Sequence, residues 1–441
     1  MNFRFLHTVG LVLLGLLIAG CPGSQSNELA HDPMAGVVRF EYSKIRVVQQ
    51  YSDRPYIHLR LYFEGGAALR DPARVGLQAL AIEAALRGGA GTMSGANFRQ
   101  KLEMRGAEVK TEYGPDHSAV VLNCLSEQFE AVWGIFSQAL LDPQFSEADF
   151  RQIQREMVAR VAERVEDPVQ QAHRLAEAAG FSPETADDPS AAQINAYSAP
   201  QARAYFTQEL AQKCRLVLVT VGPIDGEGIV DLLLDNLDRL PEGPCGETRP
   251  PEWIANSRSL RARQSSARIQ AVSGVLIRQT EAALPADGLA PVWADLLDLV
   301  LQARLREVGL EGSLRVSAEV RRGQPIRLTM QSPRALACTE ILLAELRKLK
   351  ENGLSAEEWE RIRRHLLTAR ALAWESAEGM GKYLGESNLL VDPALWGSEL
   401  RGLQEMSLKA VNGRIRQELG GVTWGYVGDT TRMDRQNLEN L

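Results

Sequence analysis

The chain has 441 residues, of which 45% are apolar and 24% are charged, and its formal net charge is −7. This composition is typical of a folded globular protein, and the length is enough for about two or three domains. The acidic excess is mild and no basic stripe is present, so nucleic acid is not expected as a partner.

The first twenty residues have the features of an export signal. An apolar stretch from Val9 to Ala19, too short to span a bilayer well, leads into Gly20 and Cys21. Small residues directly before a cysteine resemble the bacterial lipobox, which implies cleavage before Cys21 and lipidation of that residue. An ordinary signal peptide followed by an incidental cysteine is the alternative. We therefore predict a signal peptide over 1–20 and a flexible tether over 21–36.

Helices and strands are predicted from the spacing of apolar residues. In the first half, strands are expected at 56–64, 108–113, 118–124 and 216–222. Helices are expected at 76–88, 94–105, 125–141, 146–166 and 202–210. Because strands come early and late with helices between them, the predicted class is α+β, with mostly antiparallel sheets packed against helices.

The second half repeats the first. The segment that begins at Phe145 resembles the one that begins at Leu354, 209 residues later, and the strand 216–222 resembles 422–429. A two-copy repeat of this length indicates a duplicated domain. The predicted domains are 37–235 and 263–441, joined by a linker rich in proline and glycine over 236–262.

Four cysteines follow Cys21, namely Cys124, Cys214, Cys245 and Cys338. An exported protein lies where disulfides are allowed. The spacing of the four carries no pairing information, so buried free thiols are predicted and the disulfide state is left open.

One segment, Gly76-Leu77-Gln78-Ala79-Leu80-Ala81-Ile82-Glu83-Ala84-Ala85-Leu86-Arg87-Gly88, resembles the zinc-binding helix of the pitrilysin/insulinase family of metallopeptidases. In active members this helix reads roughly G-L-x-H-x-x-E-H-x-L-x-x-G. Three further phrases are similar to family phrases in the same order: Arg105-Gly106-Ala107-Glu108, Leu141-Asp142-Pro143-Gln144-Phe145 and Glu166-Asp167-Pro168. The resemblance implies a processing-peptidase-like short subunit with two homologous domains.

The family's zinc site is missing from this sequence. Active members bind zinc through two histidines and a glutamate, while a second glutamate takes a proton from the metal-bound water. The resemblance places Ala79, Ile82, Glu83 and Arg160 at these four positions. Only Glu83 could bind a metal, so no catalytic residue, metal or other cofactor is predicted. Glu83 and Arg160 could form an ion pair between two helices, or both could point to solvent.

In some two-chain members of the family, the partner subunit supplies an arginine and a tyrosine that contact the substrate backbone. The matching phrase here spans 305–313 and lacks the tyrosine. Arg304 and Arg306 are therefore candidates for contact with a substrate, or else ordinary arginines on a helix surface.

Three functions follow from the resemblance. The first is a non-catalytic, lipid-anchored homologue of a zinc metallopeptidase, paired with a catalytic homologue in the degradation or processing of peptides or proteins. The second is a peptide-binding or assembly lipoprotein without activity, and the third is an active zinc peptidase with displaced ligands. The expected location is the bacterial cell envelope, at the periplasmic face of a membrane. The sequence does not identify the substrate, the partner or which of the two membranes holds the lipid.

Overall fold

The computed structural model describes residues 34, 36–65, 74–113, 117–180, 189–243, 245, 260–266, 268–277, 290–307, 313–318, 326–390 and 398–432. The predicted signal peptide, Cys21 and nearly all of the tether lie outside these residues. Within the described part of the chain, no helix has both the length and the apolar composition that crossing a bilayer requires.

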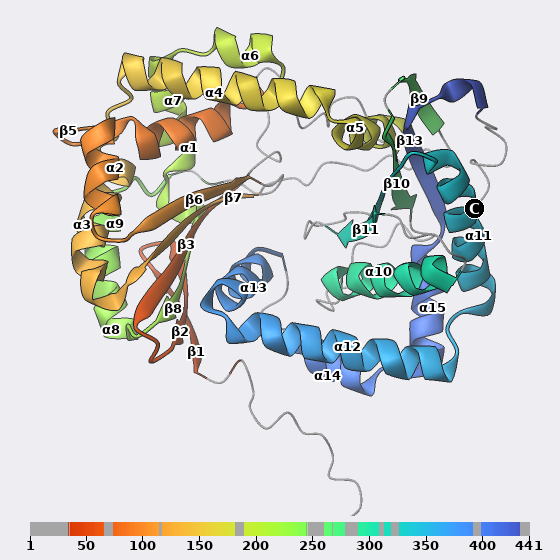
Figure 1. Ribbon diagram of the computed structural model, residues 1–441. Coiled ribbons are helices and arrows are strands. Elements are labelled where there is room, and N and C mark those ends of the chain that lie inside the picture. The colour runs from red at the N-terminus through yellow and green to blue at the C-terminus, as the bar shows by residue number, and fades with distance from the viewer. Residues whose placement is uncertain are drawn as a thin grey trace, which may run out of the picture. The chain divides into compact units, whose positions relative to one another are not determined.

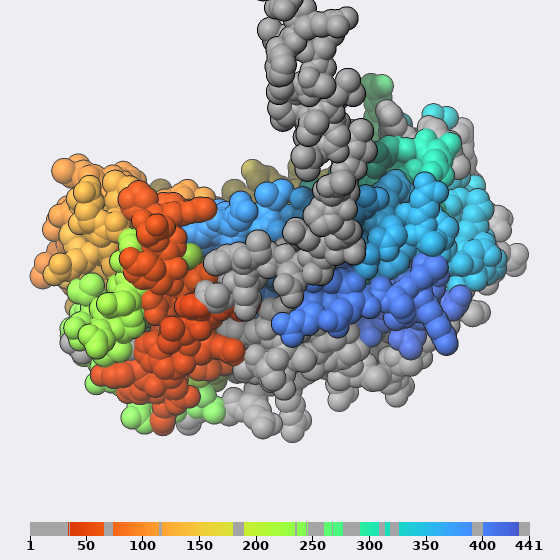
Figure 2. Space-filling view, turned by 90° about the horizontal axis from the view of Figure 1, so that it is seen from below, coloured from red at the N-terminus to blue at the C-terminus, as the bar shows by residue number. Residues whose placement is uncertain are grey.

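The first sheet has six strands in the order β1-β2-β8-β3-β7-β6 (Figure 1). The strands are β1 (Val37–Tyr42), β2 (Ile45–Tyr51), β3 (Tyr56–Glu64), β6 (Glu108–Tyr113), β7 (His117–Leu125) and β8 (Leu216–Gly222). All neighbours are antiparallel except β2 and β8. The outer strand β1 is largely exposed, and Figure 2 shows this red segment at the surface. In contrast, the central strand β3 is buried on both faces.

The second sheet has five strands in the order β11-β12-β10-β13-β9. They are β9 (Leu260–Gln264), β10 (Gln270–Ile277), β11 (Ser313–Ala318), β12 (Ile326–Ser332) and β13 (Gly421–Gly428). Only β13 and β9 are parallel. The order β6-β7-β3-β8-β2 in the first sheet matches β11-β12-β10-β13-β9 strand by strand, with the parallel pair in the same place. The chain therefore contains one architecture twice, and the predicted α+β class with duplicated, mostly antiparallel sheets is confirmed.

Helices cover these sheets in the same order in both halves. The first half contributes α1 (Leu77–Arg87), α2 (Gly95–Glu103), α3 (Phe129–Leu141), α4 (Glu147–Glu166), α5 (Pro168–Gly180), α6 (Ala191–Ala196), α7 (Ala199–Tyr205), α8 (Gly226–Ile229) and α9 (Asp235–Leu237). The second contributes α10 (Ala290–Glu307), α11 (Ala335–Asn352), α12 (Ala356–Glu375), α13 (Ala377–Leu390), α14 (Ser398–Glu405) and α15 (Leu408–Glu418). A two-residue hairpin, β4 (Gly89–Ala90) with β5 (Met93–Ser94), joins α1 to α2.

The long helices begin where the sequence predicts. Ser146 and Ser355 cap α4 and α12, and each side-chain oxygen accepts a hydrogen bond from a backbone N–H in the first turn. Glu358 completes a capping box at the start of α12. Acidic residues in the first turn of both helices also complement the helix dipole.

Each half has its own apolar core. In the first, alternate residues of β3 (Ile57, Leu59, Leu61 and Phe63) point to one side, as the sequence predicts, and pack against α1 and α3. The opposite face of β3 carries His58, Arg60 and Tyr62, and these residues are buried as well. The alternation of apolar residues in β3 does not predict that this opposite face is buried. The element that covers it, α13, lies more than 300 residues further along the chain.

The prediction of free thiols is wrong for two of the four cysteines. Cys214 and Cys245 form a disulfide, with their Cα atoms 6.0 Å apart, whereas Cys124 and Cys338 are free and buried. The disulfide belongs to a set of contacts that attach residues 238–243 and Cys245 to the turn before β8. In this set, the backbone N–H of Lys213 donates to Pro241 O, and the Lys213 ammonium lies 2.6 Å from Asp238 Oδ1. Sequence spacing could not reveal this pairing, because it depends on how the chain folds back after α9.

We expect Cys245→Ser to lower the free energy of unfolding by about 2–4 kcal/mol, because the disulfide closes a loop of 31 residues and restricts the unfolded chain. Chemical denaturation with and without a reducing agent measures this effect. The reducing agent should destabilise the wild-type protein and leave Cys245→Ser unchanged. An equal response of the two proteins would contradict the assignment.

Candidate functional site

The segment that resembles the family's zinc-binding helix forms α1. It begins after Gly76, whose φ of 84° lies in the left-handed region, and ends at Gly88. Its residues are mostly small and apolar, which lets the helix pack closely between the first sheet and the helices α3, α4 and α7. The aligned positions Ala79, Ile82 and Glu83 therefore lie on a well-packed helix.

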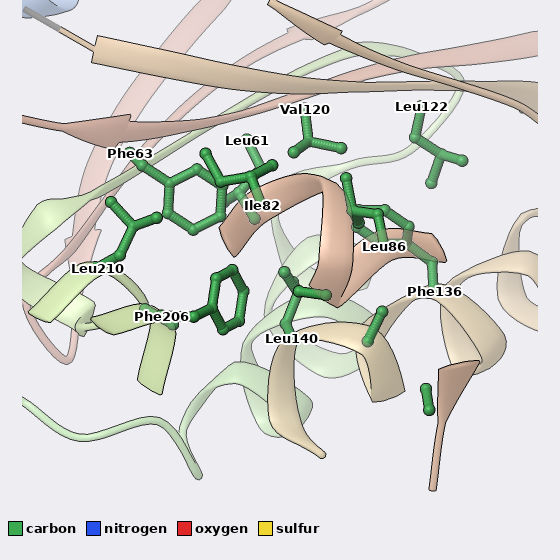
Figure 3. Close-up of a cluster of buried hydrophobic side chains, with 14 of the residues drawn as sticks. Leu61, Phe63, Ile82, Leu86, Val120, Leu122, Phe136, Leu140, Phe206 and Leu210 are labelled. Atoms are coloured by element: carbon green, nitrogen blue, oxygen red, sulfur yellow. The ribbon is translucent and has the colours of Figure 1, made fainter. Parts of the chain in front are cut away.

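Ile82, which the sequence resemblance aligns with the family's catalytic glutamate, has a fully buried side chain. Figure 3 shows Ile82 in the apolar cluster of the first half, together with residues from β3, β7, α3 and the π-helix Phe206–Leu210. Leu61 and Phe63 of β3 belong to the same cluster. A carboxylate in these surroundings would lose its hydration without gaining a partner, so Ile82 contributes to the core.

Glu83, which the resemblance aligns with the family's second histidine, is also buried. Three groups satisfy its carboxylate. The hydroxyls of Thr111 and Tyr113 on β6 donate to Oε1 at 3.0 and 3.1 Å, and Arg87 Nη1 donates to Oε2 at 3.2 Å. Desolvation and the Glu83 charge raise the pKa of Tyr113 well above its ordinary value, so its hydroxyl keeps its proton and donates.

Arg87 connects α1 to α4. Its guanidinium contacts Glu83 through Nη1, and Nη2 lies 2.6 Å from Glu156 Oε2 on α4. The hydrogen bond from Arg87 lowers the pKa of Glu156, because it favours the charged carboxylate. A single guanidinium between two carboxylates thus links α1 to α4.

Arg160 of α4, which the resemblance aligns with the family's third zinc ligand, has its Nη2 3.9 Å from Glu83 Oε1. Its side chain is 47% exposed, whereas that of Glu83 is 9% exposed. The sequence analysis left two alternatives for Glu83 and Arg160, an ion pair or two solvated side chains. In the structure they form a long ion pair, and the contacts from Glu83 to Arg87, Thr111 and Tyr113 are shorter.

Zinc does not fit these residues. It binds proteins through nitrogen, sulfur or carboxylate oxygen, and the side chains of Ala79 and Ile82 have none of these atoms. The carboxylate of Glu83 is already bonded, and the Arg160 guanidinium brings positive charge to the place of a dication. Across the described ranges, no three His, Cys, Asp or Glu side chains come close enough together to hold a metal ion.

The two arginines proposed for substrate contact have different surroundings on α10. Arg304 is mostly buried, with Nη1 3.8 Å from Glu345 and Nη2 3.4 Å from Glu358. Arg306 is exposed, and its Nε donates to Gln302 O at 3.1 Å. Residues 308–312 of the matching phrase lie outside the described residues. Arg304 thus links α10 to α11 and α12, and a role in substrate contact stays a prediction for both arginines.

Sequence reasoning missed Arg87, Thr111, Tyr113 and Glu156. Arg87 could have been found, because it follows Glu83 by four residues on a helix and such pairs face each other. The other three could not, since they come from β6 and α4 and meet Glu83 or Arg87 only in the folded chain.

The strand order and the paired halves define a two-fold repeated α+β architecture that can be compared with known structures. No protein-family model matches the sequence, and no curated protein matches it. Solved structures share the fold. The peptidase M16 inactive domain from Pseudomonas fluorescens gives a TM-score of 0.78 at 17% identity, over 89% of this chain and 98% of that chain.

Two proteases give similar values. A protease from Helicobacter pylori has a TM-score of 0.75 at 11% identity, over 89% of this chain and 99% of that one. The periplasmic protease PqqL from Escherichia coli has a TM-score of 0.73 at 16% identity, over 90% of this chain and 46% of that one. The chain thus spans about half the length of PqqL. These likenesses confirm the predicted fold, that of M16, or pitrilysin-type, peptidase domains.

Restoring the glutamate at position 82 should damage the protein. We expect Ile82→Glu to lower the free energy of unfolding by about 3 kcal/mol or more, because the new carboxylate would be buried in the apolar cluster without a partner. Ile82→Val is the matched control, with an expected loss of about 0.5–1.5 kcal/mol. Thermal or chemical denaturation measures both. Equal stability of Ile82→Glu and Ile82→Val would mean that position 82 does not face the core.

Arg87 should matter more to stability than Arg160. We expect Arg87→Met to lower the free energy of unfolding by about 1–3 kcal/mol, because the buried Glu83 carboxylate loses its closest cation. Arg160→Met should cost less than about 1 kcal/mol, because its ion pair is long and half exposed. The same denaturation assay compares the two variants. A larger loss for Arg160→Met would show that Arg160, and not Arg87, is the main cation beside Glu83.

Proposed function

We propose that this protein is a non-catalytic homologue of a zinc metallopeptidase and acts as the partner subunit of a catalytic homologue, anchored to a membrane of the bacterial cell envelope through lipid on Cys21. One observation carries the proposal. The fold is intact while the four positions of the metal site hold two side chains without donor atoms, a bonded carboxylate and a guanidinium. The fold at this place therefore does not depend on a bound zinc ion.

The likenesses to solved structures support the proposal. The Pseudomonas fluorescens neighbour is described as an inactive domain and matches over almost its whole length. PqqL, a periplasmic protease, is about twice as long as the part that matches this chain. A chain that corresponds to half of a larger peptidase, and that lacks its own metal site, would gain a role in peptide cleavage by association with a catalytic chain.

The partner is tested by purifying the tagged full-length chain from detergent-solubilised native membranes. We expect a homologous chain with an intact H-x-x-E-H motif to co-purify, and peptide hydrolysis by the pair to exceed that of the catalytic chain alone. A chain that stays monomeric with every such homologue of its host would overturn the partner role.

Metal content tests the loss of catalysis. We expect the purified wild-type protein and Ala79→His to hold far less than one zinc per chain and to hydrolyse no peptide. A single histidine cannot bind zinc tightly, because affinity depends on several ligands that are already in place. Elemental analysis and a peptide assay with a chelator provide the measurements. One zinc per chain with cleavage that the chelator inhibits would instead establish a peptidase with displaced ligands.

A second candidate function is peptide binding without an enzyme partner, and the sheet edge beside the site favours it. Among the described strands, β6 pairs only with β7, so its outer edge is available to an extended peptide. Thr111 and Tyr113 on this strand also contact Glu83. Saturable binding of unstructured peptides, without hydrolysis and without a co-purifying homologue, would favour this function over the first.

A further inference from the structure

The two halves exchange a helix. α5 follows the long helix α4 of the first half, yet it packs on β10 and β13 of the second sheet. α13 follows the corresponding long helix α12 of the second half, yet it packs on β3 and β8 of the first sheet. Each sheet is thus covered on one face by its own core helices and on the other face by a helix from the other half (Figure 1).

The exchanged helices carry the same short pattern of small residues and a glutamate, 209 residues apart. Ala172, Ala176 and Glu177 on α5 correspond to Gly381, Gly385 and Glu386 on α13. In both, two small residues four apart precede a glutamate, so the small side chains lie one above the other on one face of the helix. The offset equals that of the repeat found at Phe145 and Leu354, which makes the pattern part of the duplication.

The small residues allow close contact between helix and sheet. A Cβ atom added to Gly385 would overlap the ring of Tyr62, and one added to Gly381 would overlap the imidazole of His58. At the other contact the glycine is on the strand, and a Cβ atom on Gly425 would overlap the carbonyl oxygen of Ala172. Neither interface has space for a larger side chain at these positions.

One of the two glutamates pairs with an arginine of the opposite half. Glu177 forms an ion pair with Arg327 of β12. Glu386 lies 3.8 Å from Lys382 of its own helix, and burial raises its pKa while the charge of Arg60 on β3 acts in the opposite direction. Removing Arg327 would take this partner from Glu177, so the ion pair favours α5 on the second sheet.

Hydrogen bonds complete the contact of α5. His173 Nδ1 lies 2.6 Å from Ser273 Oγ on β10, and Thr423 Oγ1 of β13 donates to Ala176 O at 3.2 Å. Ser273 and Thr423 are fully buried, so these polar groups need partners and find them on the exchanged helix.

We propose that α5 on β10 and β13, together with α13 on β3 and β8, forms a helix clasp that holds the two halves together without the covalent linker, and that the repeated small-x-x-x-small-Glu sequence is its recognition element. The binding partner of each half is then the other half of the same chain. The inference is independent of the proposed function, because it concerns only contacts within the chain.

The experiment uses the full chain with a cleavage site for a sequence-specific protease inserted between residues 250 and 256. Cys214 and Cys245 stay in the same fragment, so the disulfide cannot hold the halves together. After complete cleavage, we expect the two fragments to elute together from a sizing column at micromolar concentration. Separation of the wild-type fragments would overturn the proposal.

Gly385→Ala tests the recognition element in the same cleavable chain. We expect the cleaved halves to associate about 10-fold more weakly or worse, because the added methyl group displaces α13 from Tyr62. Gly413→Ala in α15 is the matched control, since nothing lies within 4 Å of its added Cβ, and its halves should associate as in the wild type. Unchanged association of the Gly385→Ala halves would overturn the recognition role.

A second measurement keeps the test decisive if cleaved Gly385→Ala fails to stay folded. In the uncleaved chain, amide hydrogen exchange in α13 and in β3 should be faster for Gly385→Ala than for Gly413→Ala. Combining Gly385→Ala with Tyr62→Ala makes room for the methyl group, so the double variant should recover part of the protection. Equal exchange in Gly385→Ala and Gly413→Ala would contradict the clasp.

Discussion

The exchange of α5 and α13 is the constraint on which the rest of the structure depends. A sheet covered on one face only can keep polar side chains on the other face in water. Here both faces of the central strands are buried, so the second face of β3 carries partnered polar groups such as Arg60 and His58. Burial lowers the pKa of His58, which agrees with a neutral imidazole under α13. The helix that makes this burial possible comes from the other half of the chain.

The helix that resembles a zinc helix is held by contacts of two kinds. Ile82 belongs to the apolar core, while Arg87 joins Glu83 to Glu156 and so connects α1 to α4. These contacts fix α1 without any ligand set for a metal at the aligned positions. A fold that is intact without such ligands is the basis of the proposed function.

Much of the fold could be predicted from the sequence. The limits of β3, β6 and β8 match the predicted strands, and the serine caps set the starts of α4 and α12. The four positions aligned with the family's zinc site, Ala79, Ile82, Glu83 and Arg160, came from the sequence resemblance and stay a prediction. The residues that contact Glu83 and Arg87 could not be predicted from the sequence. Strand pairing and helix packing bring Thr111, Tyr113 and Glu156 to them.

By itself, then, the sequence determined the class of fold and its duplication, because the first follows from the local spacing of apolar residues and the second from a repeat. Only the tertiary structure decided that Cys214 pairs with Cys245, that Arg87 is the main cation beside Glu83, and that each half covers the sheet of the other. These features join residues that are far apart in the chain or on different elements. Local propensity acts over a few residues and carries no information on which distant surfaces will meet.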